Sequence, residues 1–113
     1  MIKSILKNKI INGDSLEELK KIPNETFDLI FADPPYNLQL KKELTRPDRS
    51  KVEGVNDKWD KFKNFKSYDE FSLNWLSECK RILKKNGTIW VIGSYHNIFR
   101  VGSIIQDLSL IHI

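Results

Sequence analysis

The sequence contains one cysteine, Cys79, and no apolar run that approaches the length of a membrane-spanning helix. A single cysteine excludes an internal disulfide and is typical of a reducing compartment. The first residues also lack the apolar core and the small-residue cleavage site of a secretory signal. These absences predict a soluble cytoplasmic protein that has no membrane partner.

Glycine and histidine are scarce as well. The five glycines never fall in a Gly-x-Gly, so no dinucleotide-binding fingerprint follows a strand and a dinucleotide oxidoreductase fits poorly. His96 has no carboxylate or cysteine at ligand spacing, and we therefore predict no metal site.

The residues that are present are typical of a small globular protein. With 113 residues, 40% hydrophobic and 30% charged, the chain forms at most one small domain and is compatible with part of one. The net charge of +4 suits an anionic partner but does not require one.

Hydrophobic periodicity predicts strands and helices in alternation. The expected elements are a strand at 9–12, a helix at 15–21, a strand at 27–32, a polar segment at 37–66, a helix from 67, a strand at 88–92 and a helix at 97–107. Strands separated by helices pair in parallel, so we expect an α/β fold. Three strands are few for an open parallel sheet, and the chain resembles an incomplete half of a Rossmann-like domain with flanking helices.

Local signals predict the helix ends and the core. Ser15 with Glu18, and Ser67 with Glu70, stand at capping-box spacing and mark the starts of the first two helices. The C-terminal signals of the second helix are Lys84, Lys85 and Gly87. Its apolar stripe consists of Phe71, Trp75, Leu76, Cys79, Ile82 and Leu83. The strand at 27–32 is expected to be covered on both faces, and the core is expected to include Trp75, Cys79 and Trp90.

The most informative motif is Asp33-Pro34-Pro35-Tyr36, directly after the apolar strand at 27–32, because open α/β sheets bind ligands at the carboxyl ends of strands. The exocyclic amine of an aromatic base is a poor nucleophile, since its lone pair is delocalised into the ring. The Asp33 carboxylate and the Pro34 carbonyl can each accept one of its N–H bonds and favour attack on a methyl cation equivalent. The two prolines stiffen the loop, and Tyr36 offers a face on which a flipped base can stack.

Asp-Pro-Pro by itself commonly ends a strand and begins a turn, but the whole tetrapeptide after a buried strand favours catalysis. The motif at 33–36 resembles that of amino-group DNA methyltransferases that modify adenine N6. Wider stretches at 27–40, 46–48, 50–52, 59–60 and 89–102 resemble the cell-cycle-regulated adenine methyltransferases, the permuted β-class enzymes that methylate adenine in GANTC sites. The resemblance runs from about residue 10 to residue 108 and is most specific at 93–100.

This resemblance implies roles for individual residues. The catalytic set would be Asp33, Pro34, Pro35 and Tyr36, with the first two holding the target amine and the tyrosine stacking on adenine. The implied methyl donor is S-adenosylmethionine, with Asp14 and Asp33 beside it, although Asp14 is equally well interpreted as a helix N-cap. The implied substrate is double-stranded DNA in the bacterial nucleoid, and a full-length enzyme is compatible with a homodimer.

The expected DNA contacts lie mainly in the segment 37–66. It holds nine Lys/Arg against five Asp/Glu, a surplus of four that equals the net charge of the whole chain. Basic residues interleaved with apolar ones suit a loop on a phosphate backbone, while a solvated surface remains the ordinary interpretation of any single lysine. The candidate DNA-binding residues are Asn37, Leu38, Lys41, Lys42, Arg46, Arg49, Lys51, His96 and Arg100. His96 is alternatively a cap of the last helix.

The chain departs from this family in two places. The Phe-x-Gly-x-Gly loop that binds the methyl donor is missing, because in the permuted class it lies nearer the C-terminal end. After residue 108 the family continues with a glycine and an aromatic strand, whereas residues 109–113 are interpreted as a divergent tail in which His112 has no function. We expect residues 1–108 to be the N-terminal part of a catalytic domain, with a partly bare apolar sheet face.

Two alternative functions remain open from the sequence. The first is another amino methyltransferase, which acts on cytosine N4, on RNA or on a glutamine amide; Asp at position 33 favours adenine by resemblance. The second is a non-catalytic nucleic-acid-binding module, which rests on the basic segment alone.

The missing donor loop leads to the prediction that the 113-residue chain alone transfers no methyl group to duplex GANTC DNA. Nothing else in the sequence replaces the glycine loop, so cofactor affinity should be very weak. Incorporation of tritiated methyl groups from S-adenosylmethionine measures this. Transfer above the level given by the Asp33→Ala chain would contradict the prediction.

Overall fold

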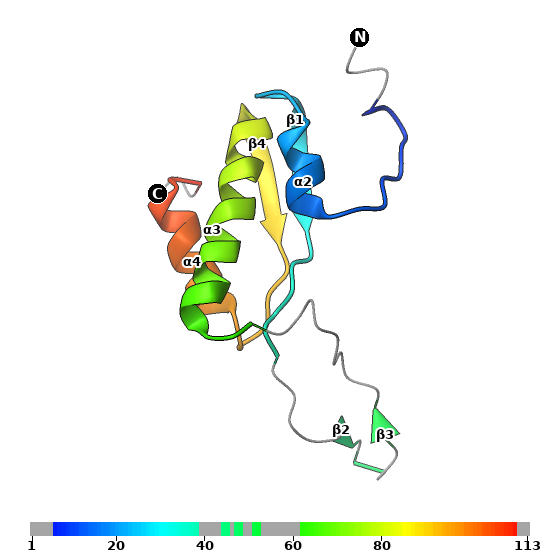
Figure 1. Cartoon of the computed structure of the whole chain (residues 1–113), viewed down its shortest axis with the longest axis vertical. Helices are drawn as coiled ribbons and strands as arrows, with labels where there is room; N and C mark the ends of the chain where they lie inside the picture. Colours follow the sequence, from blue (N-terminus) through cyan, green and yellow to red (C-terminus); the bar gives the residue numbers. More distant parts are fainter. Residues whose placement is uncertain (1–5, 39–43, 46, 49–50, 53–61, 111–113) are drawn as a thin grey trace.

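The computed structural model describes residues 6–38, 44–45, 47–48, 51–52 and 62–110. Its elements are α2 (Ser15–Lys20), β1 (Phe27–Ala32), β2 (Leu44–Thr45), β3 (Lys51–Val52), α3 (Phe65–Ile82), β4 (Leu83–Val91) and α4 (Ile98–Asp107) (Figure 1). The predicted strand at 27–32 is confirmed as β1, and the helix predicted at 97–107 is confirmed as α4 with Asn97 as its N-cap.

β1 and β4 lie side by side as a parallel pair (Figure 1). Leu29 is opposite Thr88 and Ala32 is opposite Val91. The amide of Ile92 extends the ladder by donating to the Ala32 carbonyl at 2.9 Å. Parallel strands need a crossover connection, which here includes α3. The predicted α/β class is therefore confirmed as a partial Rossmann-like arrangement.

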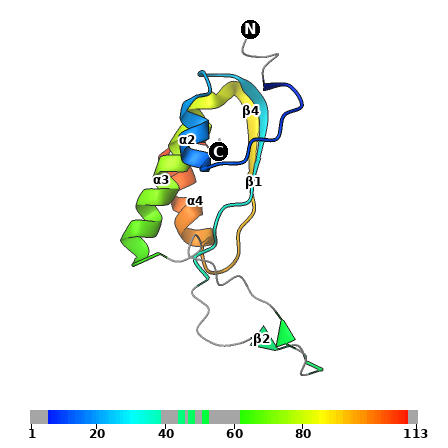
Figure 2. The ribbon, with the colours of Figure 1, turned by 45° about the vertical axis from the view of Figure 1, so that its right-hand side comes forward.

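The three helices α2, α3 and α4 cover one face of this sheet (Figure 2). The buried cluster beneath them consists of Tyr68, Trp75, Leu76, Cys79 and Val101. The sheet contributes to it through partly buried Ile30, Ala32, Ile89 and Val91. Full burial of a large apolar side chain stabilises a fold by about 1.5–3 kcal/mol, so this helical layer holds the sheet in place. The predicted core positions Trp75, Leu76 and Cys79 are confirmed.

The opposite face of the sheet is apolar and exposed. Leu29, Phe31 and Trp90 are 59%, 67% and 62% exposed, and Phe31 is paired with Trp90 across the two strands. No helix in the described ranges covers this face. The expected bare sheet face is confirmed, whereas the expectations that β1 is covered on both faces and that Trp90 lies in the core are wrong. The physical reason is that, among the described residues, no second layer packs against this side of the strands.

Residues 9–12 do not form the predicted strand. Ile10 is fully exposed and Ile11 is 51% exposed. A β-branched segment becomes a strand only where a neighbour completes its backbone hydrogen bonds. Among the residues that the structure describes, β1 and β4 pair only with each other, so residues 9–12 have no such neighbour.

Both predicted capping boxes are wrong, because another residue caps each helix. Asp14 caps α2, with its Oδ1 accepting the Glu17 amide at 3.0 Å. Asn64 caps α3, with its Oδ1 accepting the Ser67 amide at 2.8 Å. Ser67 is therefore not the N-cap of α3. Its backbone amide is instead the donor that the Asn64 side chain caps. The first-turn amides lack intrahelical partners, and the first suitable side chain upstream satisfies them.

The basic residues Lys84 and Lys85 and the following Gly87 do not end α3 as predicted. α3 ends at Ile82, and the chain enters β4 at Leu83. The register shifts between the Phe27–Leu83 pair and the next pair of the ladder, so these residues bulge within the strand. Residues 88–91 of the strand predicted at 88–92 form the regular part of β4, and Ile92 lies just beyond its end.

Two residues of the expected divergent tail cap the C-terminal end of α4. Ser109 has a left-handed backbone with φ 57°, and its amide donates to the Gln106 carbonyl at 3.0 Å. The Leu110 amide donates to the Ile105 carbonyl at 3.1 Å, which completes a Schellman cap. Residues 111–113, including His112, lie outside the described residues.

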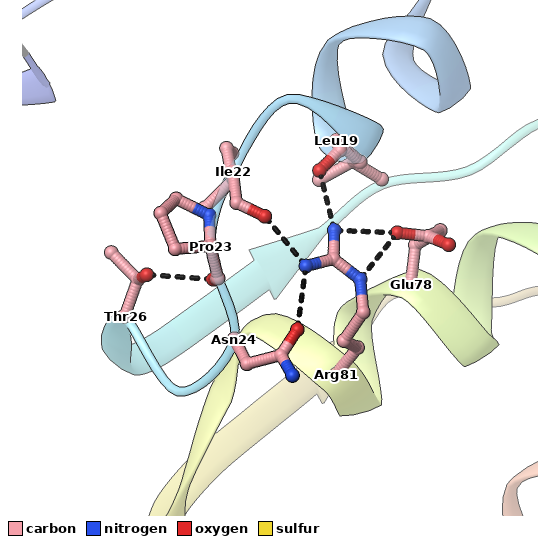
Figure 3. A network of polar contacts seen from close by, with 7 residues as sticks. All are labelled: Leu19, Ile22, Pro23, Asn24, Thr26, Glu78 and Arg81. Atoms are coloured by element: carbon pink, nitrogen blue, oxygen red, sulfur yellow. Dashed lines mark hydrogen bonds and ion pairs between the residues drawn. The ribbon is translucent and has the colours of Figure 1, made fainter. Parts of the chain in front are cut away.

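Arg81 links the end of α3 to the connection between α2 and β1 (Figure 3). Its guanidinium donates to the carbonyls of Leu19 and Ile22 at 2.9 and 2.6 Å. It also donates to the Asn24 side chain at 3.0 Å. Glu78 accepts hydrogen bonds from Nε and Nη2 of Arg81 at 2.8 and 2.7 Å and so fixes the plane of the guanidinium. The Leu19 carbonyl also accepts the Ile22 amide at 3.0 Å, and Arg81 adds a second donor to it and a donor to the Ile22 carbonyl, at the end of a short helix where carbonyls lack the full set of helical partners.

Replacement of Arg81 should therefore be costly. Arg81→Ala leaves two partly buried carbonyls without this donor, and we expect a loss of about 2 kcal/mol in the free energy of unfolding. Urea unfolding followed by circular dichroism measures it. The matched control is Lys20→Ala, which removes an exposed pair with Glu17 and should change stability by less than about 0.5 kcal/mol. Equal effects of the two variants would contradict the structural role of Arg81.

Cys79 has the packing role that the sequence predicts. It is 3% exposed, and burial, with a smaller contribution from the neighbouring Glu78 charge, raises the pKa of its thiol from 9.0 to about 11. The thiolate is the reactive form, so the folded protein holds this group in its inert state.

We predict that Cys79 resists alkylation by iodoacetamide at pH 8 until the chain unfolds. Both burial and the raised pKa suppress the reaction, so labelling should proceed through unfolding alone. Mass spectrometry with and without urea measures the modified fraction. Labelling in native buffer at the rate of a free cysteine would show that the α3 interface is open.

Candidate active site at the carboxyl ends of β1 and β4

The pairing of β1 with β4 brings two loops together at one edge of the sheet. Ala32 and Val91 are paired at the ends of the strands. The Asp33–Tyr36 motif follows β1 directly, and residues 93–97 follow β4. Both loops therefore leave the sheet at the edge where α/β folds bind ligands.

The side chain of Tyr36 turns back onto Asp33. The Tyr36 hydroxyl donates to Asp33 Oδ1 at 2.7 Å, while Asp33 is exposed and Tyr36 is half-buried. A carboxylate accepts through two oxygens, so this bond leaves acceptor capacity for another donor. The motif thus presents an acceptor to the solvent beside an aromatic ring.

The second proline of the motif is anchored from the helical layer. The Tyr68 hydroxyl donates to the Pro35 carbonyl at 2.7 Å, and Asn97 Nδ2 donates to the Tyr68 hydroxyl at 3.1 Å. Asn97 Oδ1 accepts the Ser94 amide at 2.7 Å. The loop after β1 and the loop after β4 are therefore joined through a buried tyrosine.

A cavity of about 390 Å³ opens beside the motif, between α2, α3 and the end of β1. Its apolar lining comprises Ile11, Leu19, Ile30, Phe31, Ala32, Pro34, Pro35, Phe71 and Trp75, together with Cys79. Its polar lining comprises Ser15, Glu18 and Asp33. Apolar walls with a few polar groups are typical of small-molecule sites of this size. Two larger hollows, of about 650 and 670 Å³, contain no residue of the motif.

Asp14, the other candidate for the cofactor, serves as the N-cap of α2. One of its carboxylate oxygens is engaged by the Glu17 amide. Asp14 is exposed and is not among the residues that line the 390 Å³ cavity. The N-cap interpretation is confirmed, and a cofactor contact would have to use the remaining oxygen.

The two candidate DNA-binding residues after the motif are not freely exposed. Asn37 is only 5% exposed and has a left-handed backbone with φ 59°, which asparagine tolerates better than most residues. Leu38 is half-buried.

His96 and Arg100 lie on the segment after β4. The His96 amide donates to Ser94 Oγ at 3.2 Å, and its ring stacks on Tyr95 with the centroids 4.1 Å apart. Since Asn97 is the N-cap of α4, His96 is not its cap. Arg100 pairs with Asp69 at 2.7 Å and lies 4.1 Å above the Phe65 ring. A DNA phosphate would have to compete with the carboxylate for this guanidinium.

The basic candidates of the 37–66 segment are largely beyond the described residues. Those outside the described ranges are Lys41, Lys42, Arg46 and Arg49. Lys51 begins β3, which pairs with β2, but its side chain is not described.

Metal-ligand clusters and membrane-spanning helices are absent from the part of the chain that the structure describes. Within these ranges, no group of three or more His, Cys, Asp and Glu side chains is arranged to hold a metal ion. None of the helices described here has the length and apolar character needed to cross a membrane.

Sequence reasoning missed Tyr68 and recognised Asn97 only as a helix start. Tyr68 precedes Phe71 by three positions and Trp75 by seven, so helical spacing extends the apolar stripe to it. That signal indicates burial of the ring. It does not indicate the partner of the hydroxyl, which is a carbonyl 33 residues away.

Comparison with known proteins agrees with this geometry. A family pattern described as DNA methylase matches residues 27–112. The type II methyltransferase M.HinfI of Haemophilus influenzae is 56% identical over 102 residues, which are 90% of this chain and 28% of that protein. The type II methyltransferase M2.DpnII of Streptococcus pneumoniae is 38% identical over 103 residues, which are 89% of this chain and 38% of that protein. The chain thus spans well under half the length of these relatives.

Proposed function

Because the chain belongs to the DNA methylase family, we propose that residues 1–108 form the N-terminal part of the catalytic domain of a DNA methyltransferase that modifies adenine N6. The observation that carries the proposal is the position of Asp33. Its carboxylate follows a sheet strand, lines the 390 Å³ cavity and adjoins the proline-fixed backbone of the motif. The activity is that of the longer protein that the relatives exemplify.

In this proposal Asp33 and Pro34 hold the amine of a flipped adenine. The Asp33 carboxylate and the Pro34 carbonyl accept its two N–H bonds, which concentrates electron density on the nitrogen. As the nitrogen–carbon bond forms, the methyl–sulfur bond of the donor would break, leaving a neutral thioether, and one N–H proton would leave to water. The two prolines fix the backbone before the reaction, so the Pro34 carbonyl needs little reorganisation. Loss of one preorganised interaction of this kind typically lowers kcat by about 10²–10³-fold.

Tyr36 exchanges partners when the base enters. In the free protein its hydroxyl donates to Asp33. The adenine amine replaces it as the donor to the carboxylate, which releases the ring to stack on the base. Stacking contributes about 1–3 kcal/mol per base and offsets part of the cost of removing the base from the duplex.

S-adenosylmethionine, the methyl donor implied by the family, supplies an electrophilic methyl group on a sulfonium ion. The residues present fit one side of this molecule, because the cavity combines apolar walls with the carboxylates of Asp33 and of Glu18, the latter already paired with Lys21 Nζ at 3.0 Å. Such carboxylates suit a ligand with cationic groups. The chain has no Gly-x-Gly, so these residues provide only part of a cofactor site.

The finer assignment is to the permuted β-class that methylates adenine in GANTC sites, and it rests on the resemblance at 27–40 and 93–100. The basic segment 37–66 would contact the DNA phosphates, with His96 and Arg100 near the same edge of the sheet. Duplex DNA as substrate implies action on the nucleoid in the bacterial cytoplasm.

Asp33→Ala should abolish methyl transfer and largely spare DNA affinity, because it removes the acceptor but no phosphate contact. The test uses a chimera in which this sequence replaces the matched 102-residue segment of M.HinfI. Tritiated methyl transfer to duplex GANTC DNA measures activity, and gel shift measures affinity. Tyr36→Phe is the matched control. It keeps the stacking ring, loses the bond to Asp33 and should retain most of the activity.

The identity of the methylated nucleoside and the DNA affinity of the chimera distinguish adenine methylation from the alternative functions. Methyl groups recovered on cytosine N4 in the digested nucleosides would replace the adenine assignment. Activity that persists in Asp33→Ala would remove the catalytic assignment. DNA binding by a chimera that transfers no methyl group would favour a non-catalytic binding module.

A further inference from the structure

We propose that Tyr68 and Asn97 are positioning residues for methyl transfer, because the buried hydrogen-bonded chain through them sets the direction of the motif's backbone carbonyls. Neither residue touches the reacting atoms; they act through Pro35. The catalytic consequence rests on the proposed function, whereas the positioning itself is a property of this chain and can be measured without methyl transfer.

The chain of bonds has a defined direction. Asn97 Oδ1 is occupied by the Ser94 amide, so Asn97 Nδ2 faces the Tyr68 hydroxyl and donates to it. A hydroxyl has one proton, and Tyr68 therefore directs its own proton to the Pro35 carbonyl at 2.7 Å. Tyr68 and Asn97 are each 1% exposed, so water cannot readily replace either partner.

Fixing the Pro35 carbonyl also restricts the Pro34 carbonyl. The peptide group between them is planar, and the proline ring locks φ of Pro35 near −65°. One torsion, ψ of Pro35, is the remaining freedom between the two carbonyls. A bond from Tyr68 to the Pro35 oxygen therefore restricts where the Pro34 oxygen, the proposed amine acceptor, can point.

Packing holds both members of the chain in place. The Tyr68 ring contacts Phe62 edge-to-face, with the centroids 4.8 Å apart. On the other side, a Cβ at Gly93 would lie 3.2 Å from Asn97 Oδ1 and 2.9 Å from Ile98 Cδ1. The glycine thus permits the close approach of Asn97 to the loop after β4. The two loops are held by one rigid connection.

Two variants break the connection in different ways. Tyr68→Phe keeps the ring and its packing but removes the hydroxyl. Asn97→Asp is nearly isosteric and still accepts the Ser94 amide, but its carboxylate attracts the hydroxyl proton of Tyr68 away from Pro35. The matched control is Tyr95→Phe, the same chemical change at a side chain that is 82% exposed.

The first test is amide hydrogen exchange in the 113-residue chain, measured by NMR. We expect the amides of Tyr36 and Asn37, the first N–H groups after the prolines, to exchange at least tenfold faster in both variants. The Ser94 amide should remain protected in Asn97→Asp, and the Leu76 amide in α3 should be unchanged. Unchanged exchange at Tyr36 and Asn37 overturns the proposal. Equal acceleration at Leu76, or a variant that does not fold, assigns the residues to global stability and also overturns it.

The second test measures turnover in the M.HinfI chimera. Misplaced acceptors should lower kcat by about 10–100-fold, with KM for DNA within about twofold of the unsubstituted chimera. Normal kcat despite faster loop exchange would overturn the positioning role in catalysis. An unsubstituted chimera without activity would count against the proposed function, and the exchange rates would then still decide whether Tyr68 and Asn97 hold the loop.

Discussion

The parallel pairing of β1 with β4 is the constraint on which the rest of the structure depends. It requires a return crossover through α3, and the apolar stripe of α3 supplies the core that holds both strands. At one end of the pair, Arg81 fastens α3 to the turn before β1. At the other end, Tyr68 fastens α3 to the loop after β1. The same helix α3 therefore holds the two strands in place and positions the Asp33–Tyr36 motif.

The parts of the fold that depend on local sequence could be predicted. A continuous apolar run bounded by polar residues identified β1, and helical spacing identified most of the buried side of α3. The N-cap role of Asp14 was one of two interpretations, but the capping box was placed at Ser15, because both residues are good N-caps and the choice depends on which side chain reaches the first-turn amides. Asn64 and Ser67 presented the same ambiguity at α3.

The parts that depend on a neighbour could not be predicted in the same way. Hydrophobicity indicates that Trp90 and Ile10 favour burial, but not whether a second layer or another strand is present to bury them. The motif at Asp33 was identified by its chemistry and its place after a strand. The hydrogen bond from Tyr68 that anchors the motif was not identified. A bond between a tyrosine hydroxyl and a carbonyl 33 residues away leaves no periodic signal in a sequence.

The bond from Tyr68 to Pro35 also limits what a change in the segment 37–66 costs the fold. These residues stand just before and just after the segment 37–66, so the domain closes the two ends of that insertion with its own contacts. The entropy of a closed loop grows only with the logarithm of its length, and doubling the length costs about 0.6 kcal/mol. A change in the length of that segment therefore costs the domain little stability, while the Asp33–Tyr36 motif keeps its position.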